Sequence, residues 1–318
     1  MLYSSTQINA ERPCPISGNN NAYIVCQKDR HGKPLRNVMS VDSGLIYVDP
    51  VPFNNTEKFY QTDYRKAYKG VHSPKPKHIY RAGKVALDRF SRISPKLRPG
   101  ASCLDAGSSS GEFVYLLKSK GFLAEGVEAN EPYAKYSMEE LNIPVTVSSF
   151  SNFQVNKKFD LITMFHVLEH LEHPLRDLSH LMSLLKPRGR MVIEVPNILF
   201  KDMGFSHKWH PGHLFSFSEK TLPSLLNKVG LVPEYCQTIE DNGNIWGEFT
   251  QCKNSNKCTK TYNLDSSQCL ESLKKARLGY YFRSKNYLKI FSRIFKQISE
   301  LRSAGSKRGL QILNDLYR

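Results

Sequence analysis

Acidic and glycine residues at a fixed spacing give the first chemical signal in this chain. Residues 102–111 read Ser-Cys-Leu-Asp-Ala-Gly-Ser-Ser-Ser-Gly, so a short apolar run reaches Asp105 and leads into a turn with Gly107 and Gly111. Glu128 follows 23 positions after Asp105, at the end of a second apolar run. A strand, a glycine turn, a helix and a second strand ending in an acid form a nucleotide-binding half of a Rossmann-type sheet. Glycine lets the backbone approach a ligand, and the acid can accept hydrogen bonds from ribose hydroxyls.

The turn differs from the dinucleotide fingerprint, in which three glycines spaced G-x-G-x-x-G seat a pyrophosphate on a helix N-terminus. Only Gly107 and Gly111 are present, and Ser109 lies between them. The carboxylate of Asp105 would repel a pyrophosphate, whereas it suits a ligand with a cationic amino-acid portion. The alternative for this motif alone is an ordinary strand-to-helix turn of another α/β protein.

Histidines form two further candidate groups. His166 and His170 follow an apolar run, where the carboxyl end of a strand would place a ligand-binding turn. Three more histidines lie within residues 207–213, in a Pro-Gly loop. Since imidazole titrates near neutrality, His210 or His213 is a candidate general base for an acceptor hydroxyl, and His166 is a candidate for ligand contact or catalysis. The alternative is that these side chains only shape their loops, and no metal site is expected from this spacing.

Alternating apolar and amphipathic segments predict the elements that position these residues. The expected strands are 103–104, 124–128, 145–147, 159–165, 190–195, 233–239 and 245–252, and the expected helices are 77–93, 112–119, 132–140, 175–185 and 219–229. A turn is expected at Lys186–Gly189. Short strands that alternate with helices predict a doubly wound, mostly parallel sheet that ends in an antiparallel pair.

The N-terminal part carries two short motifs, Cys14-Pro-Ile-Ser17 and Ser40-Val-Asp-Ser43-Gly. If each serine were a cysteine, the two motifs would be the knuckles of a zinc ribbon. Neutral hydroxyls do not hold zinc, so we expect the fold to persist there without metal. The alternative is a small β-hairpin unit with a chance resemblance.

The net charge of +16 is concentrated near the C-terminus, where residues 271–318 hold 12 Lys and Arg against 3 acids. Apolar residues recur there three and four positions apart at Leu288, Phe291, Phe295, Ile298 and Leu301. This spacing predicts a basic amphipathic helix. Such a helix packs on its own domain or on a second subunit, or lies on an anionic membrane surface.

Composition excludes several protein classes. The 318 residues are 40% apolar, which describes a soluble globular protein, and no run of 18 apolar residues could span a membrane. Residues 1–12 lack the apolar core of a secretory signal. Seven scattered cysteines argue against a disulfide framework. We therefore expect a cytoplasmic protein, with peripheral contact to the inner membrane face through residues 271–318 as an alternative.

Three ordered motifs resemble class I S-adenosylmethionine (SAM) methyltransferases. Residues 105–111 resemble their first motif, usually Asp-x-Gly-x-Gly-x-Gly, with Ser109 in place of the middle glycine. The segment His166-Val-Leu-Glu-His170 is similar to the one found in methyltransferases of ubiquinone biosynthesis and sugar modification, and residues 185–197 complete the resemblance. It covers roughly residues 77–252 and implies SAM as the cofactor, without metal.

The resemblance implies a set of site residues and a division of the chain. The implied cofactor-binding residues are Asp105, Gly107, Ser109, Gly111, Glu128, Ser149, Phe150, Phe165 and His166. The implied catalytic residues are His166, His210 and His213. The domains would be a zinc-ribbon-like unit at 1–56, a SAM-binding domain at 57–255 and a basic helical tail at 256–318.

The implied function is O-methylation of a sugar, a sugar nucleotide or a surface-polysaccharide precursor. The zinc-ribbon-like segment and residues 213–218 are similar to methyltransferases that act on sugars. No larger domain of the kind found in sugar C-methyltransferases follows the predicted sheet, which favours transfer to oxygen. Expected partners are an anionic small-molecule or glycan acceptor, a membrane surface and a second copy of the chain.

Two alternatives remain open. An RNA methyltransferase is suggested by the charge, but the chain lacks an Asn/Asp-Pro-Pro-Tyr element and a catalytic cysteine motif, so nucleic acid is the less favoured partner. A non-catalytic protein of this fold that scaffolds glycan assembly is suggested by Ser109 and by the serines at the zinc-ligand positions.

Overall fold

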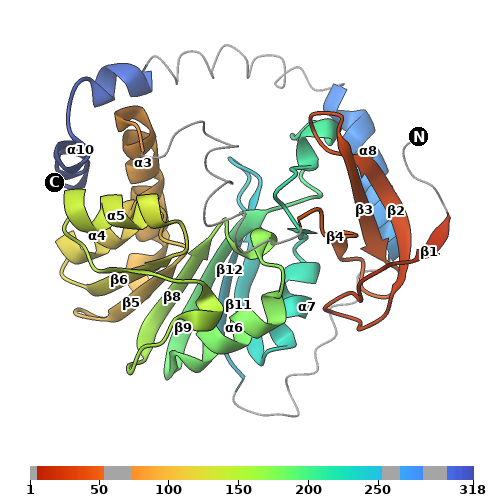
Figure 1. The fold of residues 1–318 in the computed structure, drawn as a ribbon, viewed down its shortest axis with the longest axis horizontal. Helices are drawn as coiled ribbons and strands as arrows, with labels where there is room; N and C mark the ends of the chain where they lie inside the picture. Colours follow the sequence, from red (N-terminus) through yellow and green to blue (C-terminus); the bar gives the residue numbers. More distant parts are fainter. Residues whose placement is uncertain (1–5, 54–73, 253–265, 282–298) are drawn as a thin grey trace. The chain divides into compact units, whose positions relative to one another are not determined.

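The computed structural model describes residues 6–53, 74–252, 266–281 and 299–318 (Figure 1). A seven-stranded sheet is formed by β5 (Ser102–Ala106), β6 (Leu123–Glu128), β7 (Val145–Val147), β8 (Phe159–Phe165), β9 (Leu185–Pro196), β11 (Leu231–Thr238) and β12 (Asn244–Gln251). Its strand order is β11-β12-β9-β8-β5-β6-β7. Strand β5 pairs in parallel with β6 and β8, β6 pairs in parallel with β7, and β12 runs antiparallel to both β9 and β11. The predicted doubly wound sheet and its antiparallel pair are confirmed.

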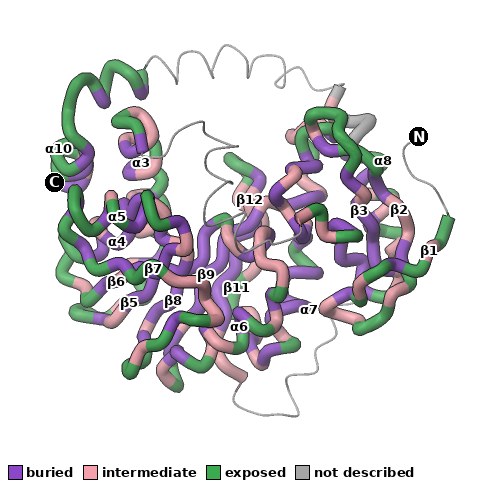
Figure 2. The backbone as a smooth tube through the Cα atoms, in the orientation of Figure 1, coloured by how far each residue is buried: buried purple, intermediate pink, exposed green. Residues whose placement is uncertain are grey.

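The strands in the middle of the order are the most buried. All residues of β8 except Asp160 are buried, and Figure 2 shows the continuous buried stretches of β8 and β9. Parallel strands are covered on both faces, so their sequences are runs of apolar residues rather than alternating ones. The run Leu-Ile-Thr-Met-Phe in β8 has this character.

The helices are α3 (Pro76–Ile93), α4 (Glu112–Ser119), α5 (Glu131–Glu140), α6 (Pro174–Ser183), α7 (Thr221–Asn227), α8 (Ser266–Tyr281) and α10 (Gly309–Tyr317). Local sequence explains several of their ends. The Asn130 side chain accepts the Tyr133 N–H at 3.3 Å and caps α5. The Ser218 hydroxyl accepts the Thr221 N–H before α7, and Gly230 follows that helix with a φ of 80°.

The chain forms two compact units, each built from separate segments. The first contains residues 1–54, 164–183 and 190–287, and the second contains residues 55–163, 184–189 and 288–318. The division expected from the sequence follows chain order, whereas both compact units combine distant parts of the chain.

The turn expected at Lys186–Gly189 is wrong, because these residues lie inside β9. The Phe159 N–H donates to the Leu184 carbonyl at 2.8 Å, and Lys186 Nζ lies 2.6 Å from an Asp160 oxygen. A Cβ on Gly189 would come within 2.8 Å of the Phe159 carbonyl oxygen. Contact with the start of β8 therefore keeps this Pro- and Gly-containing segment extended.

A second sheet, of five antiparallel strands, lies in the first unit. Its strands are β1 (Gln7–Asn9), β2 (Asn21–Lys28), β3 (Pro34–Ser40), β4 (Ile46–Val48) and the unexpected β10 (Phe215–Ser216), in that order. An apolar cluster joins Met39 and Ile46 of this sheet to Trp209 and to Cys269 and Leu273 of α8. This cluster gives the N-terminal segment a hydrophobic core of its own.

The two N-terminal motifs lie beside each other in the structure. The Cys14 Sγ lies 3.2 Å from the Ser43 Oγ, and the Ser17 Oγ lies 3.4 Å from the Ser40 Oγ. The Ser43 N–H also donates to the Ser40 hydroxyl at 3.3 Å. Hydrogen bonds therefore connect the four residues at the positions that the cysteines of a zinc ribbon would occupy.

Five cysteines in the described part of the chain are free thiols: Cys14, Cys26, Cys103, Cys236 and Cys269. Cys252 is disulfide-bonded, a single bonded position that the expectation against a disulfide framework did not foresee.

The described parts of the C-terminal region pack on folded structure. Helix α8 contributes to the apolar cluster of the first unit, and α10 packs against α3 and α4 in the second. The Tyr317 hydroxyl donates to the Glu112 carbonyl at 3.0 Å. Leu301 is 56% exposed, while Leu288, Phe291, Phe295 and Ile298 of the predicted stripe lie outside the described residues. No helix in the described part of the chain combines the length and apolarity needed to cross a membrane.

Replacing Ser17, Ser40 and Ser43 together by cysteine should create a zinc site with Cys14. We expect one tightly bound Zn²⁺ per chain and a higher melting temperature with zinc than with a chelator, because four thiolates close a tetrahedral shell. Metal analysis of the purified variant measures this, with Ser17→Cys alone as the control. A triple variant that binds no zinc would show that the four positions do not form a ligand shell.

Candidate active site

The loop after β5 has the left-handed backbone that close approach to a ligand requires. Gly107, Ser109 and Gly111 have φ angles of 81°, 52° and 82°. A non-glycine residue pays about 1–2 kcal/mol in this region, because its Cβ crowds the following carbonyl oxygen. Ser109 thus adopts the conformation of the glycine usual at its position. Gly111 is also required by packing, since a Cβ there would lie 2.4 Å from Ile143 Cδ1.

Glu128 connects this loop to the end of β6. It is 8% exposed, and its two oxygens accept the N–H groups of Ser109 and Asn130, each at 2.8 Å. A carboxylate oxygen can accept more than one hydrogen bond, so Glu128 can also accept ribose hydroxyls. Gly126 makes room for the loop, because a Cβ there would lie 2.4 Å from the Ser108 Oγ.

Asp105 is buried and bonded to protein. Its Oδ1 accepts the Thr163 hydroxyl at 2.7 Å, which ties β5 to β8. Burial raises the pKa of Asp105 to about 6, against the Thr163 hydrogen bond, which lowers it. The carboxylate of Asp105, predicted to bind the ligand, thus forms a hydrogen bond that links β5 to β8.

Ser149 and Phe150 belong to the same compact unit as Asp105 and Glu128. The preceding residue, Ser148, donates its N–H to the Glu128 carbonyl at 3.1 Å, which joins the ends of β6 and β7. Both predicted residues are half-buried, and the Ser149 hydroxyl lies 3.2 Å from that of Ser151. The structure therefore brings the residues predicted on β5, β6 and the segment after β7 into one unit.

His166, in the first unit, lies between two buried carboxylates. Its Nδ1 is 3.4 Å from Glu169 Oε1 and its Nε2 is 3.5 Å from Glu194 Oε1. Its backbone is left-handed, with a φ of 56°, and its N–H donates to the Glu194 carbonyl at 2.8 Å. Burial lowers the pKa of His166, but Glu169 and Glu194 outweigh it and raise the pKa to about 9. The imidazole is therefore a cation and a donor at neutral pH, which makes it unsuited to act as a base.

Three other histidines gather in the same unit. The rings of His210 and His213 are stacked with centroids 4.4 Å apart, and His170 meets His213 edge-on at 4.8 Å. Burial lowers the pKa of His210 to about 3 and that of His213 well below 6.5, so both are neutral at pH 7. His210 Nδ1 accepts the Gly212 N–H at 2.9 Å, so its acceptor nitrogen is engaged by the loop. His213 is the better candidate base of the pair.

One group of side chains is arranged so that it could hold a metal ion. Ligand atoms of Glu169, His170 and His213 all lie within 4.8 Å of one another. His170 Nδ1 bonds to the Gly212 carbonyl at 2.7 Å, which fixes its ring. His207, by contrast, is exposed and lies 3.3 Å from Ser206 Oγ. The expectation of a metal-free site stays a prediction.

Two residues near His166, Asn244 and Glu194, were not predicted from the sequence. Asn244 Nδ2 donates to Glu194 Oε1 at 2.5 Å and lies 3.1 Å from His166 Nε2. An acid within the apolar run Met-Val-Ile-Glu-Val is the signal that could have identified Glu194. Phe165, predicted to contact the cofactor, is 9% exposed and stacks on Trp246 with centroids 5.9 Å apart.

Comparison with known proteins identifies the domain. Residues 78–235 match the family model described as a methyltransferase domain. The ubiquinone biosynthesis O-methyltransferase of Paramagnetospirillum magneticum (strain ATCC 700264 / AMB-1) is 30% identical over 128 residues, which cover 36% of this chain and 51% of that protein. Thus the match spans about half the length of the curated relative.

Solved structures of methyltransferases are also similar. Magnesium protoporphyrin IX methyltransferase of Synechocystis PCC 6803 with bound SAH is 15% identical with a TM-score of 0.48, covering 61% of this chain and 97% of that one. The 1,6-didemethyltoxoflavin-N1-methyltransferase of Burkholderia thailandensis is 16% identical with a TM-score of 0.46, covering 67% and 98%.

The family match includes the loop after β5, Glu128 and the turn at His166. The chain therefore carries a methyltransferase domain, built on the seven-stranded sheet of the SAM-dependent class.

Ser109→Gly should stabilise the protein by about 1 kcal/mol, because glycine adopts a positive φ without strain. Urea unfolding of the variant and the wild type measures the difference. Ser119→Gly, at the end of α4, is the matched control and should destabilise, since glycine weakens a helix. A loss of stability in Ser109→Gly similar to the control would contradict the strain at this position.

The imidazolium of His166 should make stability depend on pH. Because the folded pKa of about 9 exceeds the ordinary 6.5, the contribution is fully present below pH 6.5 and is lost as pH rises through 9. His166→Asn keeps a residue that tolerates left-handed backbone and removes the charge. Urea unfolding across this window should show the wild-type advantage shrinking, whereas the exposed-site control His207→Asn should show no such trend. A constant difference between wild type and His166→Asn would refute the charged state.

Proposed function

We propose that this methyltransferase domain uses SAM to methylate a hydroxyl group of a small polar acceptor. The observation that carries the proposal is the glycine-type loop after β5 bonded to the buried Glu128 carboxylate, within the span that matches the methyltransferase family. Transfer to oxygen is supported by the relative that is an O-methyltransferase of ubiquinone biosynthesis.

The residues of the second unit fit the cofactor. Positive φ at Gly107, Ser109 and Gly111 opens the loop to a ligand, and Glu128 keeps acceptor capacity for ribose hydroxyls. SAM, when bound there, supplies a methyl group activated by its positively charged sulfur. The buried acid Asp105 and Glu128 give this region a negative potential that favours such a cation.

Methylation of a hydroxyl also requires removal of its proton, and the histidines of the first unit can perform that step. His213 is neutral because burial disfavours its charged form, so it has a lone pair that can receive the proton. His166, already charged and bonded to Glu169 and Glu194, would supply a positive charge that favours the acceptor oxygen as it loses its proton. This assignment gives His213 the role of base and His166 that of a charged group that stabilises the acceptor oxygen.

A sugar, a sugar nucleotide or a surface-polysaccharide precursor is the acceptor class that we propose. Support comes from the sequence resemblance of the N-terminal motifs and of residues 213–218 to methyltransferases that act on sugars. Convergence of Cys14, Ser17, Ser40 and Ser43 supports the N-terminal part of that resemblance. The second candidate is a non-catalytic scaffold, favoured by the serines at three of these four positions.

Glu128→Gln should weaken SAM binding about tenfold or more, because hydrogen bonds to a charged acceptor are worth about 1.5–3 kcal/mol. Calorimetry with SAM and with its demethylated product measures the affinity. Glu125→Gln on the same strand, whose carboxylate pairs with Lys157, is the matched control and should bind as the wild type does. Equal affinity in both variants would remove Glu128 from the cofactor site, and no binding by the wild type would favour the scaffold.

The acceptor can be identified by measuring methyl transfer from SAM to a panel of candidate acceptors. We expect mass spectrometry to detect methylation of at least one member of a panel of nucleotide sugars, with SAM as donor and equal rates with and without EDTA. His213→Asn should lower turnover and leave SAM affinity unchanged. Loss of activity in EDTA would instead assign a metal to Glu169, His170 and His213, and methylation confined to a phenolic panel would overturn the sugar class.

A further inference from the structure

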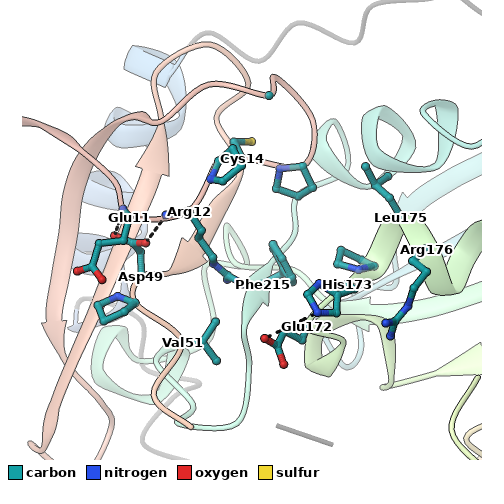
Figure 3. Close-up of a pocket in the computed structure, with 15 residues that line it drawn as sticks. Glu11, Arg12, Cys14, Asp49, Val51, Glu172, His173, Leu175, Arg176 and Phe215 are labelled. Atoms are coloured by element: carbon teal, nitrogen blue, oxygen red, sulfur yellow. Dashed lines mark hydrogen bonds and ion pairs between the residues drawn. The ribbon is translucent and has the colours of Figure 1, made fainter. Parts of the chain in front are cut away.

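A cavity of about 840 Å³ lies in the first unit, and none of the residues predicted to bind SAM or to act in catalysis lines it (Figure 3). Its walls come from residues 11–15 and Gly18, residues 49–51, residues 172–176 and Phe215. All of these segments belong to one compact unit. A volume of this size accommodates a small organic molecule.

Most of the cavity wall is apolar and stiff. The apolar lining residues are Pro13, Pro15, Pro50, Val51, Pro174, Leu175 and Phe215. Proline has a fixed φ and no N–H group, so these walls offer contact surface with few donors. A ligand that fills the cavity therefore needs an apolar or ring-shaped body.

Arg12 is the main polar group of this wall. Figure 3 shows its side chain extending toward Phe215, and the guanidinium carbon lies 4.8 Å from that ring's centroid and 5.3 Å from that of Tyr47. One terminal nitrogen donates to the Leu214 carbonyl at 3.2 Å, while the buried Nε has no hydrogen-bond partner among the described residues. A buried donor without a partner costs about 1–3 kcal/mol, which a ligand oxygen would recover.

Two acids that line the cavity, Asp49 and Glu11, form their ion pairs with Arg36 and not with the Arg12 guanidinium. Asp49 accepts the N–H groups of Glu11 and Arg12, both at 3.1 Å, and pairs with Arg36 at 3.0 Å. Glu11 also pairs with Arg36, at 2.8 Å. Among the described residues, no carboxylate lies within ion-pair distance of the Arg12 guanidinium, so its charge is available to an anion.

The opposite wall adds to the positive potential. Helix α6 begins at Pro174, so its N-terminal partial charge faces this end of the cavity. Arg176 lines the same wall, is 58% exposed and pairs with Asp177 at 3.0 Å. Glu172 is the opposing charge of this wall, and it lies 3.9 Å from His173. Since Arg176 is paired, Arg12 is the lining arginine whose guanidinium has no ion-pair partner among the described residues.

We infer that this cavity binds a small organic anion, whose carboxylate or phosphate group accepts hydrogen bonds from Arg12 while an apolar or ring body packs on Phe215 and the prolines. The planar guanidinium fork matches both kinds of oxyanion. The inference depends on the lining alone and is independent of the proposed methyl transfer.

Calorimetry on the full chain tests the site with three matched probes: phenyl phosphate, benzoate and benzyl alcohol. We expect at least one of the two anions to bind about tenfold or more tightly than the neutral alcohol, as charge-assisted hydrogen bonds predict. The tighter anion identifies the class, phosphate or carboxylate. Equal affinity for all three probes, or no binding of either anion at millimolar concentration, would overturn the inference.

Variants connect the binding to Arg12. Arg12→Leu should lower the affinity for the anion about tenfold or more. Arg12→Lys should retain part of that affinity, because lysine keeps the positive charge but lacks the planar pair of guanidinium donors. Arg98→Leu removes an equal charge at a side chain that is 83% exposed, and it should bind as the wild type does. If Arg12→Leu fails to fold, Val51→Trp tests the site instead. The larger side chain narrows the cavity while Arg12 stays in place, so the affinity for the anion should fall. Wild-type anion affinity in Arg12→Leu, or in a folded Val51→Trp, would refute the site.

Discussion

Buried carboxylates at strand ends are the constraint on which the candidate residues of each compact unit depend. The four acids of the candidate residues, Asp105, Glu128, Glu169 and Glu194, are each less than a tenth exposed. An ionised carboxylate in such a place loses several kcal/mol of hydration unless nearby donors compensate. The chain supplies the Thr163 hydroxyl to the first, two backbone N–H groups to the second and the His166 imidazolium to the last two. Each of these donors fixes a turn or strand end where a ligand could bind.

The same constraint accounts for two of the three described non-glycine residues with a positive φ. Ser109 and His166 both have positive φ, and each faces one or more of these carboxylates. Strain of about 1–3 kcal/mol persists only where surrounding contacts hold a residue in place, and such residues cluster at functional sites. In the case of His166, the contact that holds the residue also sets its charge, because two carboxylates keep the imidazole protonated. The resulting group is a cation bonded to both carboxylates, whereas burial keeps His213 neutral.

The local sequence predicted the strands of the large sheet, but it did not predict the protonation state of His166. Strands β7 and β8 and helix α4 have the bounds that periodicity predicts, because burial on both faces selects continuous apolar runs. The prediction of a turn at Lys186–Gly189 was wrong. Pro and Gly favour a turn locally, but contact with the start of β8 holds this segment in an extended strand. The short β10 could not be predicted, because its partner β4 lies far away in the chain. The ionisation of His166 was equally hidden, since it depends on Glu194, a residue of another strand.

Asp49 contacts two arginines in different ways: it forms an ion pair with Arg36, but it accepts only a backbone hydrogen bond from Arg12. Asp49 is fully buried and is neutralised by Arg36, while Arg12 contributes only its backbone N–H to that carboxylate. The Arg12 guanidinium is left against Phe215 and Tyr47, and burial lowers its pKa although Asp49 acts in the opposite direction. Aromatic faces compensate a cation only in part, by about 0.5–2 kcal/mol. A residue that served packing alone would be more stable there as leucine or methionine, so the unneutralised charge in the cavity wall is best explained by an anion that binds to it.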